Sequence, residues 1–415
     1  MDTFSYDRKM RHCIFTLTTI FLISCGGGGG GGSEPSAPVP QNISVSLTAS
    51  ADSAEVNSSI TLTWSSTLAT SCSASGSWSG SKGTSGSESI TIGVGGSNTF
   101  SLSCSASGAN SGSASTTVNG LRYFDGIVFD GYIRGAEVFV DINDNLSLDS
   151  NEASVITDNQ GSFTKLLFGD GTLVSTSGFD LDTGVDLTNL TLVHELEGYE
   201  TSKIVSPFTT LIAYMSNALN INAALGIHDS IDLLTTDPIP NLGEEIYDQM
   251  YEKGNQLTVI ALTLQNYLDD SSSQIYFQAI ANELEKSYSS QESSVNIEDK
   301  NFISNVIDEV ETLSSNTFNL DAKRNLNTII SSVVPFLEVK NDQSITTSIQ
   351  RFAFSTLQDD VRNTEIMLGS ASSTIGKYTN QPGQYIADDQ GIVATDINNP
   401  PSDLMSATDC TGSLF

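Results

Sequence analysis

The sequence predicts a multidomain β + α fold, with two β-sandwiches followed by a C-terminal all-α bundle. Between residues 43 and 200, β-branched and aromatic residues alternate with polar ones in short runs that Gly, Ser and Asn turns separate. From residue 201 onward, apolar residues recur at helical spacing instead. A chain of 415 residues also has room for two or three domains at about 100–200 residues each.

Residues 1–24 have the features of a lipoprotein signal peptide. Basic residues precede an apolar run, Ile14–Ile23, that is shorter than the ~20 residues a membrane span needs. The run ends in Leu22-Ile23-Ser24-Cys25, which resembles the lipobox of bacterial lipoproteins. The resemblance implies that Cys25 becomes the lipidated first residue. By resemblance to lipoproteins of two-membraned bacteria, a Gly rather than an Asp at position 26 implies the outer membrane, facing the periplasm or the cell surface. The alternative is a short anchor helix with an incidental cysteine.

Residues 25–42 are expected to form a Gly- and Pro-rich tether. Seven glycines at 26–32 precede a stretch of Ser, Glu, Pro, Ala and Val. This composition cannot build a core and is typical of a flexible linker with a stiffer, Pro-rich end. The lipid on Cys25 would then hold the folded part to the membrane through this tether.

The chain is strongly acidic, with 49 acidic and 17 basic residues and a formal net charge of −32. Nucleic acids and anionic membrane surfaces carry charge of the same sign, so the composition disfavours both as partners. It favours solubility and the binding of cations.

Residues 43–119 are expected to form the first sandwich. Five strands are predicted, at 43–49, 59–64, 88–92, 99–104 and 113–118. Leu62-Thr-Trp-Ser-Ser and the pair Cys72 and Cys104 resemble the bacterial immunoglobulin-like domains of surface proteins. Trp64 precedes the first cysteine, whereas antibody-type domains place a Trp between the two. The disulfide therefore need not join the two sheets.

The cysteines suit an oxidising compartment. Cys13 would leave with the signal peptide and Cys25 would take the lipid. Cys72 and Cys104 remain as the expected disulfide. Cys410 is then either free or paired between chains.

Trp78 leaves an alternative open for this region. An exposed Trp in Gly76-Ser-Trp-Ser-Gly80 would stack on a sugar and make a glycan-binding face. A packed Trp is the simpler interpretation.

The stretch Asp141–Glu152 has the ligand pattern of a calcium loop. Calcium takes six to eight oxygen ligands, and a twelve-residue loop supplies them from positions 1, 3, 5, 7, 9 and 12. The residues at these positions all carry oxygen donors: Asp141, Asn143, Asn145, Ser147, Asp149 and Glu152. The pattern resembles the loop of EF-hand and dockerin-like modules.

One residue departs from that pattern. Leu146 stands where a Gly makes a turn with positive φ, at a cost of about 1 kcal/mol. An acidic turn without a metal is the alternative, because Asp and Asn are ordinary turn residues.

The flanks of the loop predict a strand–loop–strand site. Ala136–Val140 and Ala153–Thr157 both have strand composition. Gly-Ala-x-Val followed by Thr-Asp-x-x-Gly-x-Phe resembles the transthyretin-like β-sandwich repeats of bacterial surface adhesins, with Gly161 at a turn that needs positive φ. Residues 121–200 are therefore expected to form a calcium-binding β module.

A second acidic turn lies within the same module, at 178–184. Asp180 and Asp182 would serve another cation, but the turn lacks a full ligand set.

Residues 201–370 are expected to be helical. Ser206 is a good N-cap and Pro207 suits the first helical position. Further helices are predicted near 222–234, 243–268, 273–288, 299–315, 321–338 and 342–367, and Pro335 would kink or shorten the fifth of these. Ser-Pro-Phe-Thr-Thr-Leu resembles helical segments after calcium modules in large bacterial surface proteins, which implies no activity. Residues 371–415 are expected to be a loosely structured tail.

The sequence favours a non-enzymatic function. Gly-x-Ser-x-Gly, His-Glu-x-x-His and Gly-rich phosphate motifs are missing, and His194 and His228 lack partners at ligand spacing. We expect a calcium-binding cell-envelope lipoprotein with a structural or adhesive role. The alternatives are a surface module that binds a glycan or a protein, and a secreted hydrolase with a carboxylate pair in the helical region.

Overall fold

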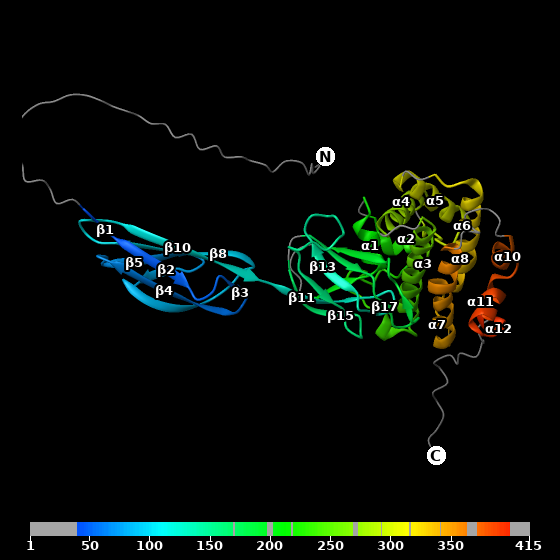
Figure 1. The fold of residues 1–415 in the computed structure, drawn as a ribbon, viewed down its shortest axis with the longest axis horizontal. Helices are drawn as coiled ribbons and strands as arrows, with labels where there is room; N and C mark the ends of the chain where they lie inside the picture. Colours follow the sequence, from blue (N-terminus) through cyan, green and yellow to red (C-terminus); the bar gives the residue numbers. More distant parts are fainter. Residues whose placement is uncertain are drawn as a thin grey trace, which may run out of the picture. The chain divides into compact units, whose positions relative to one another are not determined.

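The computed structural model describes residues 40–168, 171–196, 202–216, 219–268, 273–291, 293–314, 317–340, 342–362 and 372–398. The expected signal peptide, Cys25, most of the tether and Cys410 lie outside the described residues. A β-rich part comes first and a helical part second, as the sequence predicts (Figure 1). Residues from 117 onward belong to one compact unit together with 49–61 and 89–98, and the rest of the first β region forms the other unit.

The first β region contains two main sheets. One has the order β2-β4-β7 (Ser44–Ala49, Ser59–Thr67, Ser85–Thr91). The other has the order β3-β10-β8-β5-β6 (Ser53–Glu55, Gly112–Leu121, Gly96–Ser105, Ser71–Gly76, Gly80–Lys82), and a short pair joins β1 (Gln41–Asn42) to β9 (Ala109–Asn110). All five expected strands are present. Every second residue at the start of β4 is buried, which is the period of a strand with one face on a core.

Trp78 is packed inside this region, so a sugar-stacking face on it is excluded. Its side chain is only 6% exposed. Its ring lies edge-on to Trp64 at 5.4 Å between centroids, and its Nε1 donates to the Ser101 carbonyl at 3.1 Å. Lys82 Nζ lies 4.8 Å from the ring centroid. The simpler interpretation of Trp78 is the correct one.

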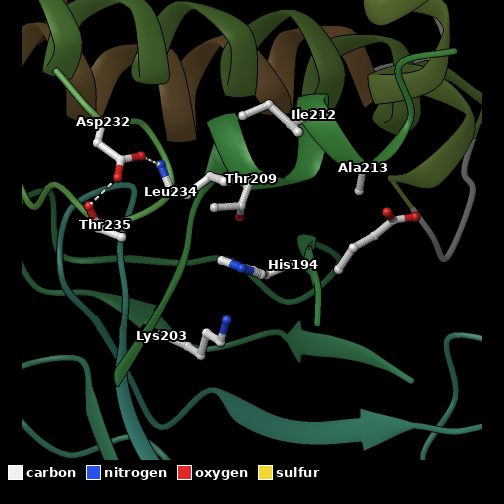
Figure 2. Close-up of a pocket in the computed structure, with 9 residues that line it drawn as sticks. His194, Lys203, Thr209, Ile212, Ala213, Asp232, Leu234 and Thr235 are labelled. Atoms are coloured by element: carbon white, nitrogen blue, oxygen red, sulfur yellow. Dashed lines mark hydrogen bonds between the residues drawn. The ribbon is translucent and has the colours of Figure 1, made fainter. Parts of the chain in front are cut away.

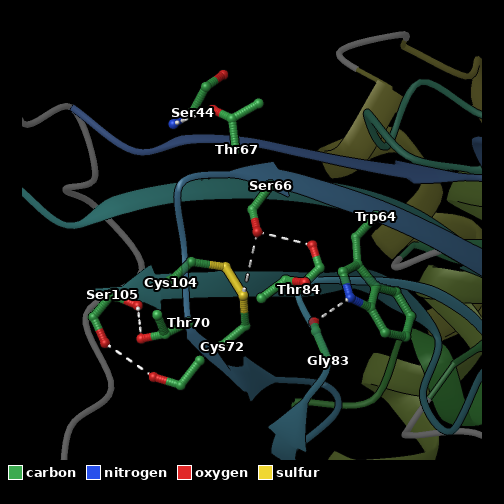
Figure 3. The surroundings of a disulfide bond; sticks show 11 residues. Ser44, Trp64, Ser66, Thr67, Thr70, Cys72, Gly83, Thr84, Cys104 and Ser105 are labelled. Carbon is green, nitrogen blue, oxygen red and sulfur yellow. Dashed lines mark hydrogen bonds between the residues drawn. A yellow bond between two sulfur atoms is a disulfide. The ribbon is translucent and has the colours of Figure 1, made fainter. Parts of the chain in front are cut away.

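Cys72 and Cys104 form the expected disulfide, and it joins two strands of one sheet. The two residues lie directly opposite each other on the antiparallel strands β5 and β8. Figure 3 shows the bond beside Ser66, whose hydroxyl lies 3.8 Å from Cys72 Sγ. The disulfide therefore does not join the two sheets, which is the possibility that the position of Trp64 before the first cysteine left open.

The second β region, residues 123–205, also has two main sheets. One has the order β15-β11-β20 (Ser162–Leu167, Tyr123–Val128, Ser202–Val205). The other has the order β14-β13-β16-β19 (Ser154–Ile156, Glu137–Asp141, Thr172–Thr176, Thr191–Glu195), and a small third sheet holds β12, β17 and β18 (Ile133–Arg134, Phe179–Asp180, Val185–Asp186). Gly161 has φ +68°, which matches the turn expected from the sequence.

The central strands of the four-stranded sheet are buried on both faces. Val138 and Val140 point into the main core, whereas Phe139 packs with Val174 and Val193 in a separate small cluster on the opposite face. Such strands have runs of apolar residues rather than alternation.

The helices follow from Pro207. α1 (Pro207–Ala213) begins with the expected N-cap, where Ser206 and Thr209 form a reciprocal capping box. The other α-helices in the described part of the chain are α2 (Ile221–Leu225), α3 (Glu245–Leu268), α4 (Gln274–Gln291), α5 (Lys300–Ser314), α6 (Leu320–Val333), α7 (Gln343–Arg351), α8 (Leu357–Arg362), α10 (Ser372–Asn380), α11 (Pro382–Gln390) and α12 (Ala394–Asn398). No helix among the described residues combines the length and apolar character needed to cross a membrane.

One apolar core runs from Phe124 in β11 to Ile397 in α12. Helix α3 lies within it, and every residue from Gly254 to Tyr267 is buried. The expected division near residue 200 therefore does not separate two cores. The second β region and the helices are parts of one compact unit.

Two predictions about the helical part are wrong. The helix expected at 222–234 ends at Leu225, because Gly226 closes α2 with φ +73° in a left-handed C-cap. Residues 372–398 form three helices instead of a loose tail, and Tyr378, Ile386 and Ile397 are buried. Pro335 acts as expected, since α6 ends at Val333 and a 3-10 turn, Val334–Phe336, follows.

The disulfide makes a testable contribution to the first β region. It closes a loop with a sequence separation of 32 residues. Replacing Cys72 and Cys104 by Ala should lower the free energy of unfolding of this region by about 3 kcal/mol. Urea unfolding followed by Trp fluorescence checks this, because both Trp residues lie in this region. The control is Ser71→Ala with Ser105→Ala, an exposed cross-strand pair joined only by a hydrogen bond. Equal stability of the two double variants would contradict the assignment.

Candidate metal loop and neighbouring cavities

The twelve-residue loop connects two paired strands. β13 ends at Asp141 and pairs antiparallel with β14, with Glu137 opposite Ile156 and Phe139 opposite Ser154. The site is therefore a strand–loop–strand hairpin, as the flanking sequence predicts. Asp141 is fully buried, so the first expected ligand is held by the sheet itself.

The first half of the loop is a series of side-chain turns. Asp141 Oδ1 accepts from Asn143 N at 3.1 Å, and Asp141 Oδ2 accepts from Leu146 N at 2.6 Å. Asn143 Oδ1 accepts from Asn145 N, and Asn145 Oδ1 accepts from Ser147 N at 2.7 Å. Each oxygen thus fixes the backbone two or more residues ahead of it, which winds the chain into a tight loop.

The second half closes the loop onto the first. Asp149 Oδ2 accepts from the side-chain amides of Asn143, at 2.7 Å, and Asn145, at 3.0 Å. Glu152 Oε1 accepts from Ile142 N and its Oε2 accepts from Asp149 N, both at 2.9 Å. Ser147 Oγ donates to the Asn145 carbonyl at 3.5 Å, so the side chains at all six expected positions belong to one hydrogen-bonded network.

Leu146 adopts the turn conformation that the pattern requires. Its φ is +55°, and that of Asp144 is +59°. The Leu146 side chain packs against the small cluster of Phe139, Val174 and Val193. Leu146 is only partly buried, so it gains part of the about 1.5–3 kcal/mol of full burial, which acts against a left-handed backbone cost of about 1 kcal/mol. This packing gives the Leu side chain a contact that a Gly at this position would lack.

The chemistry of the loop suits a hard cation. Its donors are three carboxylates, two amide oxygens and the backbone and hydroxyl of Ser147, all of them oxygen. Within the described ranges no group of three or more His, Cys, Asp or Glu is arranged to hold a metal ion. The three carboxylates of the loop, Asp141, Asp149 and Glu152, therefore do not form such a group, and the expected ligand set depends on the amide and hydroxyl oxygens as well.

A cavity of about 420 Å³ lies between β19, β20, α1 and the turn at 232–235. Figure 2 shows His194 and Lys203 in it, and both residues are buried. His194 Nδ1 lies 2.5 Å from the Ile204 carbonyl, Thr209 Oγ1 donates to the Val193 carbonyl, and Asp232 accepts from Leu234 N and Thr235 Oγ1. These bonds hold the surrounding elements together, so the polar groups have structural partners.

A cluster of buried carboxyl groups joins the second β region to α3. Asp130 accepts from Thr258 Oγ1 at 2.9 Å, and Asp182 accepts from the Tyr251 hydroxyl at 3.1 Å. Asp180 is the third carboxyl group of the cluster. Its Oδ1 accepts from the backbone amides of Asp182 and Thr183, and its Oδ2 accepts from the Thr183 hydroxyl. The sequence indicated Asp180 and Asp182 but not Asp130, which comes from a distant turn and has no motif around it.

Burial sets the acidity of this cluster. It raises the pKa of Asp130 well above its usual range, and the neighbouring Asp180 raises it further, whereas the Thr258 hydrogen bond lowers it. Burial also raises the pKa of Asp180 and of Asp182. Asp130 Oδ2 has no hydrogen-bond partner among the described residues. The cluster therefore favours neutral carboxyl groups.

Comparisons of the chain with known proteins do not assign it to a family. No protein-family model matches the chain, and no curated protein matches it. Among solved structures, the chain has a likeness to the major pilin subunit of Bacillus cereus, with a TM-score of 0.18 and 8% sequence identity over 39% of this chain and 69% of the pilin chain. A likeness at that level shows neither a shared fold nor a shared function.

The raised pKa of Asp130 predicts how stability depends on pH. A carboxyl whose folded pKa lies above its unfolded pKa stabilises the fold below the unfolded value, near 3.9, and this stability is lost as pH rises through the folded pKa. Asp130→Asn should therefore raise the melting temperature at pH 7 by at least about 2 °C, and the gain should disappear near pH 4. Thermal melts at the two pH values check this.

Asp186→Asn is the matched control, because Asp186 is an exposed carboxylate on the neighbouring strand β18. It should change the melting temperature little at either pH. A lower melting temperature for Asp130→Asn at pH 7, with no change toward acid pH, would contradict the account of the cluster.

Proposed function

We propose that this protein is a calcium-binding, non-enzymatic lipoprotein of the cell envelope with a structural or adhesive role. Its ion would be held by Asp141, Asn143, Asn145, Ser147, Asp149 and Glu152. One observation carries the proposal: a β-hairpin presents a twelve-residue loop in which the expected ligand side chains form one network and Leu146 has the required positive φ.

The hydrogen bonds within the loop bring its negative charges together without an ion. Glu152 bonds to Ile142 N at the start of the loop and to Asp149 N near its end. Asp141 is buried beneath them at the end of β13. Calcium would supply the positive charge that balances these three carboxylates.

The ion would act mainly on stability. A ligand that binds only the folded state stabilises it by RT ln(1 + [L]/Kd). With a Kd of ~10⁻⁴ M, typical of extracellular sites, and ~10 mM calcium, this is about 2.7 kcal/mol. Because Leu146 packs against the small cluster of Phe139, Val174 and Val193, an ordered loop would also hold the face of β13, β16 and β19 that carries this cluster.

The rest of the proposal comes from the sequence. A signal peptide, a lipid on Cys25 and a Gly-rich tether would place the protein on the outer membrane. An immunoglobulin-like sandwich would act as a spacer, and a transthyretin-like module would carry the calcium loop. The charge of −32 favours a solvated surface and a cation-rich exterior.

Calcium should raise the melting temperature of the unit that contains the loop. A stabilisation near 2.7 kcal/mol corresponds to a rise on the order of 5 °C in ~10 mM calcium compared with EDTA. Asp149→Asn with Glu152→Gln should remove most of this rise, because amides keep hydrogen-bonding capacity but lose the charge. Differential scanning calorimetry with and without calcium checks both.

The matched control is Asp144→Asn. It removes one negative charge from the same loop at a position outside the ligand pattern, so the calcium response should remain. Magnesium at the same concentration should give a smaller rise, since it demands octahedral geometry at shorter distances. An identical melting temperature of the wild-type chain in calcium and in EDTA would remove the basis of the proposal.

A further inference from the structure

A second cavity lies directly beside the calcium loop. It has a volume of about 320 Å³. One wall is residues 145–147 of the loop, and the others come from the end of β16, the segment leading into β19 and the first residue of α4. The lining residues are Asn145, Leu146, Ser147, Thr176, Ser177, Thr188, Asn189, Leu190, Thr191 and Gln274.

The lining contains no charged side chain. Charged residues make up 16% of the chain, and the loop next to the cavity is rich in carboxylates. The lining instead combines hydroxyl and amide groups with two leucines. Groups of this kind donate and accept hydrogen bonds without attracting an ion, so the cavity suits a ligand that is polar and neutral.

The walls of the cavity are fixed by bonds that do not depend on a ligand. Ser177 Oγ donates to the Thr188 carbonyl at 2.7 Å, which ties the two sides of one wall together. Thr191 and Ser273 exchange two bonds, at 3.0 Å and 2.6 Å, and these join β19 to the start of α4. Only the wall made by residues 145–147 belongs to the calcium loop. A preformed, largely rigid site lowers the entropy cost of binding.

We infer that this cavity binds a neutral saccharide unit and that calcium in the adjoining loop holds one of its walls. The second part rests on the proposed calcium site. Hydroxyl groups of a sugar match the side chains of Thr176, Ser177, Thr188, Asn189 and Gln274, and the C–H face of a sugar ring matches the partly buried Leu146. Small-molecule sites start at about 300 Å³, and the cavity reaches this size. The absence of Lys and Arg from the lining disfavours phosphorylated or carboxylated ligands, and the absence of Asp and Glu disfavours amines.

Saturation-transfer NMR on the full chain tests the inference with five neutral sugars as probes: glucose, galactose, mannose, fucose and N-acetylglucosamine. At least one sugar should receive magnetisation in calcium. The Thr188→Trp variant fills the rim from an exposed position and should reduce the signal at least tenfold. Gln274→Ala, which is also exposed, should weaken it.

Thr164→Trp is the matched control. Thr164 is exposed on β15 of the same β region and does not line the cavity, so sugar binding should persist. Melting of each variant in calcium and in EDTA is recorded beside the NMR, so that a loss of folding is seen separately from a loss of binding.

The outcomes separate the two proposals. If calcium raises the melting temperature but none of the sugars binds, or if binding is the same in Thr188→Trp and Thr164→Trp, the saccharide site is wrong and the calcium site stands. If a sugar binds equally in calcium and in EDTA, the coupling between loop and cavity is wrong. If the calcium response is missing, the proposed function fails, whatever the sugars do.

Discussion

The shared apolar core between the second β region and the helices is the constraint on which the rest of this structure depends. Helix α3 is buried on all sides from Gly254 to Tyr267, so its polar side chains need partners inside the protein. The Thr258 hydroxyl donates to Asp130, and the Gln265 side-chain amide donates to the Asn189 carbonyl. Through such bonds the helix positions turns of the β region, including the segment that leads into β19 beside the second cavity.

The loop at residues 141–152 is attached to this arrangement from the opposite face of the sheet. β13 has Val138 and Val140 in the main core and Phe139 in the small cluster that receives Leu146. The loop is therefore not an isolated turn on the surface. Its first residue, Asp141, lies in the buried sheet, and Leu146 in its middle packs against that sheet. Binding of an ion would be transmitted to the strands through these two points.

Local rules predicted the elements whose determinants lie close together in the chain. The hairpin around the loop, the positive φ of Leu146 and Gly161, the Ser206 cap and the helix end before Pro335 each depend on a few neighbouring residues. The expected helix at 222–234 failed although Ile227, Ile231 and Leu233 are buried at near-helical spacing. A left-handed Gly226 and side-chain turns at Asp232 prevail over that periodicity.

Features that depend on distant contacts could not be read from the sequence. Trp78 and Trp64 pack on each other, the helices at 372–398 bury residues in a core begun at Phe124, and Asp130 meets Asp180 and Thr258 only in the folded chain. Of the candidate site, the sequence indicated the six ligand positions. It did not indicate the neutral cavity, because that lining is assembled from four separate segments.

Amide hydrogen exchange tests the central claim most directly, because the amides of Ile142, Leu146 and Asp149 all donate to loop carboxylates. If calcium closes and stabilises the loop, exchange at these amides should slow by up to ~100-fold in ~10 mM calcium relative to EDTA. The first β region should show no change. Equal exchange of the loop amides in calcium and in EDTA would contradict the account.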